Sequence, residues 1–377
     1  MPIKLVHAAD FHMESTFKGL GPAKAELRRA ELKQAFAKVI DLAAREQAQL
    51  LLLAGDLFEH GAAGRELMHF LDQGFRKLQA RVFITPGNHD PGLVNSPYWS
   101  YPWHENVHIF RERVEGINID ELNCTVYGLG FAHFAIKQNL LKSFKVENPA
   151  RVNIMLFHGE DKSIPVGSGE SNYLPFSVAD LAQGGADYYA IGHNHRPRVV
   201  WEDGVNVKAC YAGSPEPLGY DEGGEHGVFC GTVDKGRNNL KFVKLNERSY
   251  RTQKITCRGE EYLADLVKVC LDSIPEAERS QDFVKLVFAG EVDPGLEFHQ
   301  AKMEELLEPY FFHCKVENQT IPRYDVEHYD PRTARGMFAA KINAMLAGAD
   351  REEDKEVLRQ TLLLGLDALN LGKVVER

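Results

Sequence analysis

The sequence has no excess of positive charge. Its 377 residues include 44 Lys and Arg against 54 Asp and Glu, which gives a formal net charge of -10. Proteins that hold nucleic acid through bulk electrostatics depend on clustered Lys and Arg side chains. The composition therefore argues against such a protein, and any role on nucleic acid requires local basic patches or metal ions.

Closely spaced cysteines and long hydrophobic runs are also missing. The six cysteines are scattered without a CxxC pair, so we expect reduced thiols and neither a disulfide framework nor a zinc ribbon. The stretch MPIKLVHAADFH has no apolar signal-peptide core, and the longest aliphatic run, Leu50–Ala54, is too short to span a bilayer. We therefore expect a cytoplasmic protein with no membrane association.

A sizeable folded core is what the composition does provide. Hydrophobic residues make up 44% of the chain and charged residues 26%, which favours two or slightly more globular domains over disorder. Up to about residue 250, short apolar segments alternate with amphipathic ones. Such a βαβ rhythm predicts an α/β fold with a largely parallel sheet covered by helices. The first expected strands are 3–9, 48–55 and 81–87, and the helices between them are 24–47 and 63–78.

Polar residues follow the expected strands at the point where each strand ends. Taken singly, each is typical of a turn or of a satisfied structural histidine. Five strand ends with the same chemistry indicate a common crevice, because ligands of parallel sheets bind beyond the carboxyl ends of the strands. The five segments are ADFH (Asp10, His12), GDLFE (Asp56, Glu59), GNHD (Asn88, His89, Asp90), FHGE (His158) and GHNH (His193, His195).

Carboxylate, amide and imidazole groups without thiolates suit Mn, Fe, Zn or Mg. Seven candidate ligands are too many for one tetrahedral ion and favour two metal ions that lie close together. Two such ions need a bridging anion, and Asp56, beside Gly55 in a tight turn, suits that role. The seven candidates are Asp10, His12, Asp56, Asn88, His158, His193 and His195.

This motif series resembles the calcineurin-like metallophosphoesterase superfamily, and within it the SbcD-type DNA repair exonucleases and their YhaO-like branch. Protein phosphatases of the superfamily carry an arginine shortly after the second motif, whereas GDLFEHG has none. The stretch YAGSPEPLGYDE, residues 211–222, is similar to the element that follows the last metal motif in SbcD-type proteins. Its alternative interpretation is a loop rich in Gly and Pro.

The resemblance implies an architecture and a ligand set. Residues 1–250 are expected to form an α/β/β/α sandwich, followed by a small α+β capping domain over 251–330 and C-terminal helices over 331–377. By the same resemblance, the cofactors are two divalent ions, Mn²⁺ first, with Fe, Zn or Mg as alternatives. The implied ligands are Asp10, His12, Asp56 and His195 for one ion and Asp56, Asn88, His158 and His193 for the other.

Two further residues are assigned catalytic roles. Because Asn88 is expected to face a metal ion, its neighbour His89 should face the substrate, where it is suited to act as a general acid. In related phosphatases the carboxylate three residues after the bridging Asp orients this histidine, and here that position is Glu59, where many relatives have Asp. Asp90 is expected to cap the turn through backbone N–H groups.

The resemblance implies a metal-dependent DNA nuclease of DNA repair, a 3′-to-5′ exonuclease with endonuclease activity. Its implied partners are DNA, an SbcC-like ATPase that binds the C-terminal helices, and a second copy of the chain. Residues 251–377 carry 17 Lys and Arg against 24 Asp and Glu, which disfavours strong DNA contact there.

Three alternatives stay open. One is a phosphodiesterase or phosphatase for small molecules or nucleotides on the same fold. Another is a non-catalytic subunit that binds DNA ends or a partner, although the complete ligand set and His89 argue against it. For the C-terminal helices, the alternative to partner binding is packing on the capping domain.

Overall fold

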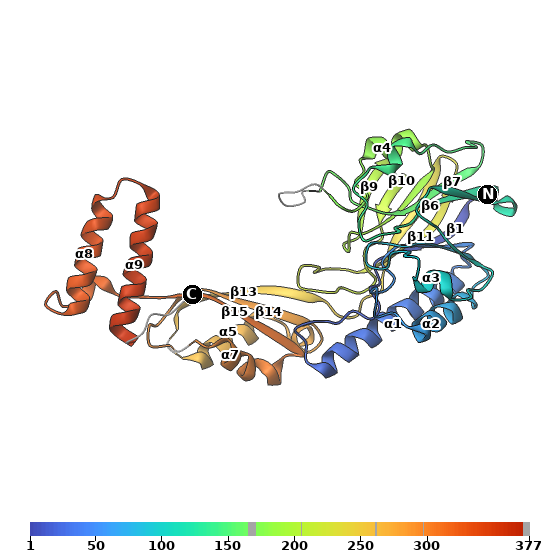
Figure 1. Ribbon diagram of the computed structural model, residues 1–377. Coiled ribbons are helices and arrows are strands. Elements are labelled where there is room, and N and C mark those ends of the chain that lie inside the picture. Colours follow the sequence, from blue (N-terminus) through green and yellow to red (C-terminus); the bar gives the residue numbers. More distant parts are fainter. Residues whose placement is uncertain (165–170, 205, 261, 297, 372–377) are drawn as a thin grey trace. The chain divides into compact units, whose positions relative to one another are not determined.

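The chain forms two compact units, Met1–Glu247 and Arg248–Arg377 (Figure 1). The computed structural model describes residues 1–377 except 165–170, 205, 261, 297 and 372–377. The last residues of the expected C-terminal segment therefore lie outside the described residues.

The first unit contains two six-stranded sheets. In the first sheet β1 to β4 run parallel, β11 pairs antiparallel with β1, and β12 pairs antiparallel with β11 at the edge. In the second sheet β6, β7, β8 and β10 run parallel, with β5 and β9 as antiparallel edges.

The first sheet has the order β12 (Arg237–Lys244), β11 (Gly227–Asp234), β1 (Ile3–Ala8), β2 (Leu50–Ala54), β3 (Arg81–Thr85), β4 (Val107–Ile109). The second has the order β5 (Glu115–Ile119), β6 (Cys124–Leu129), β7 (Val152–His158), β8 (Tyr188–Gly192), β10 (Asn206–Tyr211), β9 (Arg198–Asp203).

Side chains on β2 show how the two sheets form a sandwich. Leu50 and Leu52 belong to the core between the sheets, whereas Leu51 and Leu53 point to the opposite face and pack with the helices. This alternation follows from the two-residue period of a strand. A separate core covers the outer face of the second sheet, so the expected α/β/β/α arrangement is confirmed. The helices of this unit are α1 (Pro22–Arg45), α2 (Arg65–Phe75), α3 (Pro97–Ser100), η1 (Asp120–Leu122), η2 (Leu140–Ser143) and α4 (Val178–Gly184).

The second unit is built on a three-stranded parallel sheet in the order β13-β14-β15. Its core combines inward side chains of this sheet with apolar residues of α5 and α7, such as Leu266 and Met303. Two longer helices, α8 and α9, pack against each other so closely that a Cβ on Gly365 would lie 2.1 Å from the ring of Phe338. The bounds are β13 (Tyr250–Glu260), α5 (Leu263–Ser273), α6 (Glu276–Arg279), β14 (Phe283–Val292), α7 (Gln300–Leu307), η3 (Glu308–Tyr310), β15 (His313–Pro322), η4 (Val326–His328), α8 (Ala334–Gly348) and α9 (Glu352–Leu371).

Two expectations drawn from absent sequence features can be compared with the structure. All six cysteines, which lie in described parts of the chain, are free thiols. Among the described residues, no helix combines the length and the apolar character that crossing a bilayer would require.

The two sheets approach each other closely at the end of β8. A Cβ placed on Gly192 would lie 1.8 Å from the carbonyl oxygen of Ala54, at the end of β2, and 3.0 Å from Cβ of Ala9. No side chain fits there without moving backbone, so glycine allows the ends of β2 and β8 to meet.

We expect Gly192→Ala to destabilise the protein by about 3 kcal/mol, at the upper end of overpacking costs, because the backbone of β2 cannot yield cheaply. Thermal unfolding should show a melting temperature lower by roughly 6–12 °C. Gly64→Ala is the control: its Cβ would meet no atom within 4 Å, and its cost as a helix N-cap should stay within about 1 kcal/mol. Equal melting temperatures for Gly192→Ala and the unaltered protein would contradict this account.

Candidate metal centre

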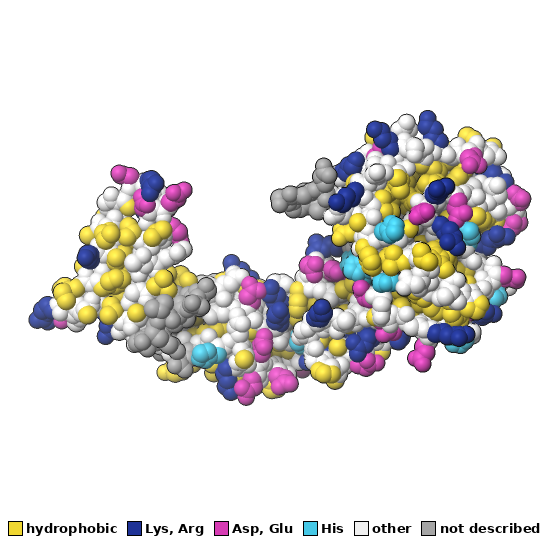
Figure 2. Space-filling model, viewed as in Figure 1, with side chains coloured by type: hydrophobic (Ala, Val, Ile, Leu, Met, Phe, Trp, Pro, Cys, Tyr) yellow, Lys and Arg dark blue, Asp and Glu magenta, His cyan; other side chains and the backbone are white. Residues whose placement is uncertain are grey.

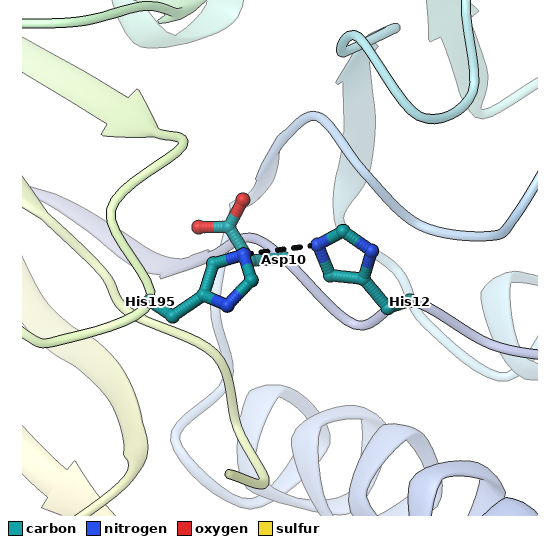
Figure 3. Close-up of side chains that lie close together, drawn as sticks. All are labelled: Asp10, His12 and His195. Carbon is teal, nitrogen blue, oxygen red and sulfur yellow. Dashed lines mark hydrogen bonds between the residues drawn. The ribbon is translucent and has the colours of Figure 1, made fainter. Parts of the chain in front are cut away.

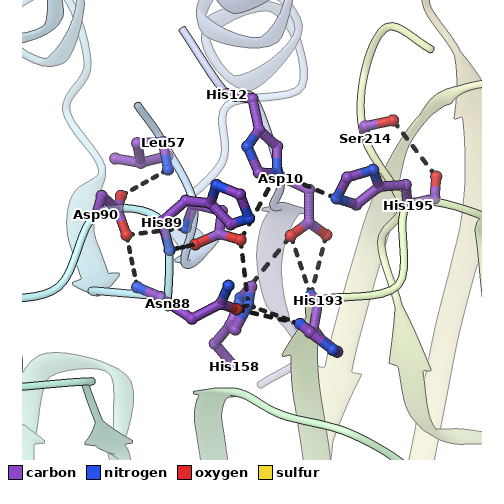
Figure 4. A network of polar contacts seen from close by, with 12 residues as sticks. Asp10, His12, Leu57, Asn88, His89, Asp90, His158, His193, His195 and Ser214 are labelled. Carbon is purple, nitrogen blue, oxygen red and sulfur yellow. Dashed lines mark hydrogen bonds and ion pairs between the residues drawn. The ribbon is translucent and has the colours of Figure 1, made fainter. Parts of the chain in front are cut away.

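All seven predicted ligands meet at one end of the sandwich in the first unit. Figure 4 labels six of them, and the contacts of Asp56 with His12 and His158 place the seventh. The seven residues come from both sheets, because parallel strands of each sheet deliver their carboxyl ends to the same edge. Histidine side chains are visible together on the surface of this unit in Figure 2. Asp10 and His12 follow β1, Asp56 follows β2, Asn88 follows β3, His158 ends β7, and His193 and His195 follow β8.

The first group consists of Asp10, His12 and His195 (Figure 3). Nε2 of His12 and Nε2 of His195 face each other at 3.0 Å. One ligand atom from each of the three residues lies within 4.8 Å of the others. Since metal–nitrogen bonds measure roughly 2.0–2.1 Å, two nitrogens at this separation are placed as two ligands of one ion would be.

The second group surrounds the side-chain oxygen of Asn88. Oδ1 of Asn88 lies 2.9 Å from Nε2 of His158 and 3.2 Å from Nδ1 of His193. The two imidazole nitrogens are themselves 3.2 Å apart. An amide oxygen and two imidazoles thus converge on one point, as the ligands of a hard or borderline metal ion do.

Asp56 lies between the two groups. Its Oδ2 is 3.6 Å from Nε2 of His12 and 3.3 Å from Nε2 of His158. Its Oδ1 accepts a hydrogen bond of 2.8 Å from the backbone N–H of His89. The carboxylate is therefore fixed through one oxygen, and the other oxygen points at both groups, the position that the sequence predicted for a bridge.

Three of the histidines are held through the ring nitrogen that faces away from the cluster. Nδ1 of His158 donates to a backbone carbonyl at the end of β2 at 2.9 Å, and Nδ1 of His12 donates to Glu59 at 2.8 Å. Nδ1 of His195 donates to Glu222 at 2.6 Å. A proton held on Nδ1 leaves Nε2 with a free lone pair, which is the tautomer that binds metals.

Glu222 is a member of the site that the sequence analysis did not identify. It closes the stretch YAGSPEPLGYDE, which was noted for another reason, and it lies 27 residues after His195. Neither periodicity nor local motif links the two positions, so the only signal was a carboxylate near the end of that stretch.

Four of the predicted ligands have a left-handed backbone conformation, as do five other non-glycine residues in the described part of the chain. The φ angles are 54° at Asp10, 47° at His12, 53° at Asp56 and 107° at His193. Non-glycine residues adopt positive φ only at an energetic cost, and such residues cluster at functional sites. The surrounding sheets hold these four side chains in directions that a relaxed backbone would not give them.

Asp90 does not face the cluster but fixes the turns that carry it. Its Oδ1 accepts N–H groups of Asp56 at 3.1 Å and Gly87 at 2.6 Å. Its Oδ2 accepts the N–H of Leu57 at 2.6 Å and the hydroxyl of Tyr98 at 2.5 Å. Asp90 thus caps its own turn, as the sequence predicted, and also joins it to the turn after β2.

His89 and Glu59 lie at the outer side of the cluster. The His89 side chain is 46% exposed, whereas the predicted ligand His158 is fully buried. Nδ1 of His89 donates to Oε2 of Glu59 at 3.0 Å, while Oε1 of the same carboxylate holds His12. The contact predicted between Glu59 and His89 is present, and Glu59 also supports a predicted metal ligand.

Burial and charge set the protonation of the site. Burial raises the pKa of Asp10 to about 8, against the attraction of His195. Burial also opposes ionisation of Asp56, but His158 and His12 outweigh it, and the pKa of Asp56 lies below its usual value. Burial lowers the pKa of His158, and that of His193 to about 3, so both rings favour the neutral form that binds metals.

Hydrogen bonds to carboxylates act in the opposite direction on two other rings. Burial works to lower the pKa of His195, but the bond to Glu222 and the charge of Asp10 raise it to about 9. The bond to Glu59 is the main reason that the pKa of His89 is raised. Two buried carboxylates, an amide oxygen and inward-facing imidazole nitrogens form a donor set that fits divalent metal ions.

Comparison with known proteins agrees with this geometry. The calcineurin-like phosphoesterase family model matches residues 3–197. "Uncharacterized metallophosphoesterase YhaO" of Bacillus subtilis (strain 168) is 27% identical over 406 aligned residues, which cover 96% of this chain and 97% of the relative. "DNA double-strand break repair protein Mre11" of Methanopyrus kandleri is 27% identical over 301 residues, 70% of this chain and 61% of that relative.

The solved structure of TT1561 from Thermus thermophilus is 14% identical and matches 65% of this chain and 100% of its own, with a TM-score of 0.38, too low to support a conclusion. The family match covers more than half of the chain and includes all seven predicted ligands, and the relatives agree with the resemblance to YhaO and SbcD-type proteins. The chain therefore belongs to the calcineurin-like phosphoesterase family of metal-dependent hydrolases.

Proposed function

We propose that the protein is a two-metal phosphodiesterase that cuts DNA, a 3′-to-5′ exonuclease with endonuclease activity that serves DNA repair. The observation that carries the proposal is the arrangement of Asp56, whose Oδ2 faces both ligand groups at 3.3–3.6 Å, beside a half-exposed His89. Such a centre suits hydrolysis of a phosphate ester. The ligand groups would activate the nucleophile, and His89 would protonate the leaving group from a separate position.

The ligand assignment follows the two groups. Asp10, His12, Asp56 and His195 would hold one ion, and Asp56, Asn88, His158 and His193 the other. We propose Mn²⁺, with Fe, Zn or Mg as alternatives that offer similar ligand preferences. When bound, the ions supply Lewis-acid chemistry: they polarise a phosphodiester and lower the pKa of a water molecule toward neutrality.

The chain itself supplies the proton for the leaving group. His89 is the exposed imidazole at the edge of the cluster, and its ring lies 4.6 Å from that of His12, centroid to centroid. Glu59 accepts from Nδ1 of His89, which directs Nε2 outward, toward a bound substrate. From there, a protonated His89 would deliver its proton to the departing sugar oxygen.

DNA as the substrate is supported by two observations. One is the similarity to a relative named as an Mre11 DNA double-strand break repair protein. The other is a pair of arginines near the cluster. Arg196 lines a depression of about 290 Å³ with His193 and His195, and three carboxylates line the same depression: Glu160, Asp221 and Glu222. Arg196 also lines a neighbouring depression of about 500 Å³, together with Arg198 and Glu225. Arg196 and Arg198 are the side chains at this place that a phosphate backbone would contact.

The C-terminal helices are proposed as the docking site for an SbcC-like ATPase. Figure 2 shows hydrophobic side chains on the visible face of α8 and α9, and Met345 is 49% and Val357 62% exposed. Apolar residues in this number on a helical hairpin are typical of a surface that packs on a partner. We further propose that the chain forms a homodimer, as SbcD-type nucleases do.

We expect the protein to degrade end-labelled duplex or single-stranded DNA with added Mn²⁺, and His89→Leu to lower kcat by roughly 10²–10⁴, because proton donation is lost. Metal content measured by mass spectrometry should stay unchanged in the variant. His69→Leu, which alters an exposed histidine on α2, is the matched control.

Hydrolysis of a simple phosphodiester without any cutting of DNA would replace DNA by a small molecule or nucleotide as substrate. Wild-type turnover by metal-loaded His89→Leu would remove His89 from the mechanism.

Glu59→Gln should lower both kcat and metal affinity, each by roughly tenfold, since His12 and His89 bind different oxygens and the carboxamide turns an NH2 donor toward one of them. Steady-state rates at saturating Mn²⁺ and a calorimetric metal titration separate the two effects. Glu66→Gln, at an exposed position in the first turn of α2, controls for loss of charge. Unchanged turnover at full metal occupancy would show that Glu59 does not orient His89.

Met345→Glu combined with Val357→Glu should abolish co-purification with the SbcC-like ATPase, because two buried charges oppose an apolar interface. Nuclease activity of the isolated protein should stay at the wild-type level. Gln360→Glu places a charge at an already polar exposed position of α9 and should bind as before. Binding retained by the double variant would mean that this face of the helices is not the docking site.

A further inference from the structure

We propose that Glu222 is a positioning residue of the metal centre: it holds His195 in the orientation and tautomer that present Nε2 to the ion. The inference rests on the proposed ligand role of His195 and deepens it. It concerns a residue outside the motif series, on the loop that follows β10.

Both oxygens of Glu222 are used. Oε1 accepts from Nδ1 of His195 at 2.6 Å, and Oε2 accepts the backbone N–H of Leu218 at 2.8 Å. The residue is 9% exposed. A carboxylate withdrawn from water costs free energy unless its oxygens are hydrogen-bonded, so this geometry is a constructed contact and not an incidental surface pair.

The loop closes on itself behind His195. Nε2 of His226 binds the backbone carbonyl of Glu222 at 2.6 Å, and Nδ1 of His226 lies 2.9 Å from the hydroxyl of Ser214. The backbone N–H of Ser214 donates to the carbonyl of His195 at 3.0 Å. The chain from His195 through Ser214 and His226 to Glu222 is therefore a ring of contacts that returns to the imidazole (Figure 4 shows the contact between Ser214 and His195).

A buried arginine anchors the same loop to helix α1. Arg28 has no exposed surface, and its guanidinium donates to the carbonyl of Pro217 at 2.7 Å and to Glu216 at 3.2 Å. Glu31, one turn further along α1, also binds it. Because α1 packs on the core of the first sheet, the segment that carries Glu222 is fixed to the rigid part of the unit.

The arrangement repeats what the other ligands show. His12 has Glu59 behind its Nδ1, and His158 has a backbone carbonyl, so each of these rings meets an acceptor on its outer side. Partners of this kind fix the ring and increase the basicity of the ligating nitrogen, and their removal weakens metal affinity by roughly 10–100-fold. Loss of a charged acceptor such as Glu222 should weaken metal affinity more than loss of a neutral acceptor such as a backbone carbonyl.

The first test measures Mn²⁺ binding to the full chain by calorimetry, after a chelator has removed bound metal. Glu222→Gln keeps the size of the side chain but removes its charge. We expect one of two binding events to weaken by roughly 10–100-fold and the other to change by less than about threefold. Glu225→Gln, on the same loop and with 67% of its side chain exposed, should bind metal as the unaltered protein does. Equal affinity of Glu222→Gln and the unaltered protein would overturn the inference.

The second test uses no Glu222 variant and reports directly which ring nitrogen of His195 carries the proton. Nitrogen NMR of the Zn²⁺-loaded protein with ¹⁵N-labelled histidine should show the proton of His195 on Nδ1, and His195→Asn identifies its signals by their loss. A proton on Nε2 would overturn the proposal. Neither test uses DNA, so a protein that binds metal but cuts no DNA leaves Glu222 in place, whereas an unaltered protein that binds no metal refutes the centre itself.

Discussion

The geometry of the centre depends on the buried carboxylate of Asp90, which faces no ligand. It accepts N–H groups from the turn after β2, at Asp56 and Leu57, and from its own turn, at Gly87. One side chain therefore joins the segments that carry the carboxylate of Asp56, the amide of Asn88 and the imidazole of His89. Separating the two turns would leave these backbone N–H groups and the buried carboxyl group of Asp90 without their hydrogen-bond partners, and unpaired buried polar groups cost free energy.

Four residues of the site have a strained backbone conformation. Asp10, His12, Asp56 and His193 all have positive φ, which each residue would relieve if the turns were free. The ends of β2 and β8 meet at Gly192 without a side chain between them, directly before His193 in the chain. The side chains predicted as metal ligands are thus brought together by the fold of the sandwich.

The acidic composition takes on a different meaning at this site. Glu59 and Glu222 each lie behind an imidazole and accept a hydrogen bond from its Nδ1. Carboxylates used in this way raise the electron density of the ligands, so negative charge in the chain supports cation binding at the centre.

The sequence by itself determined the residues that have local signatures. Strand β2 was expected at 48–55 and lies at Leu50–Ala54, and helix α1 was expected at 24–47 and lies at Pro22–Arg45, because apolar periodicity and turn residues act over a few neighbouring positions. The motif residues at the strand ends were found for the same reason. Only the tertiary structure decided the long-range partners. Glu222 meets His195 across 27 positions, Arg28 meets Glu216 across 188, and Asp90 meets the N–H of Asp56 across 34. Such pairs leave no periodic trace in a sequence, since they arise only when sheets and helices have packed and brought distant turns to one edge.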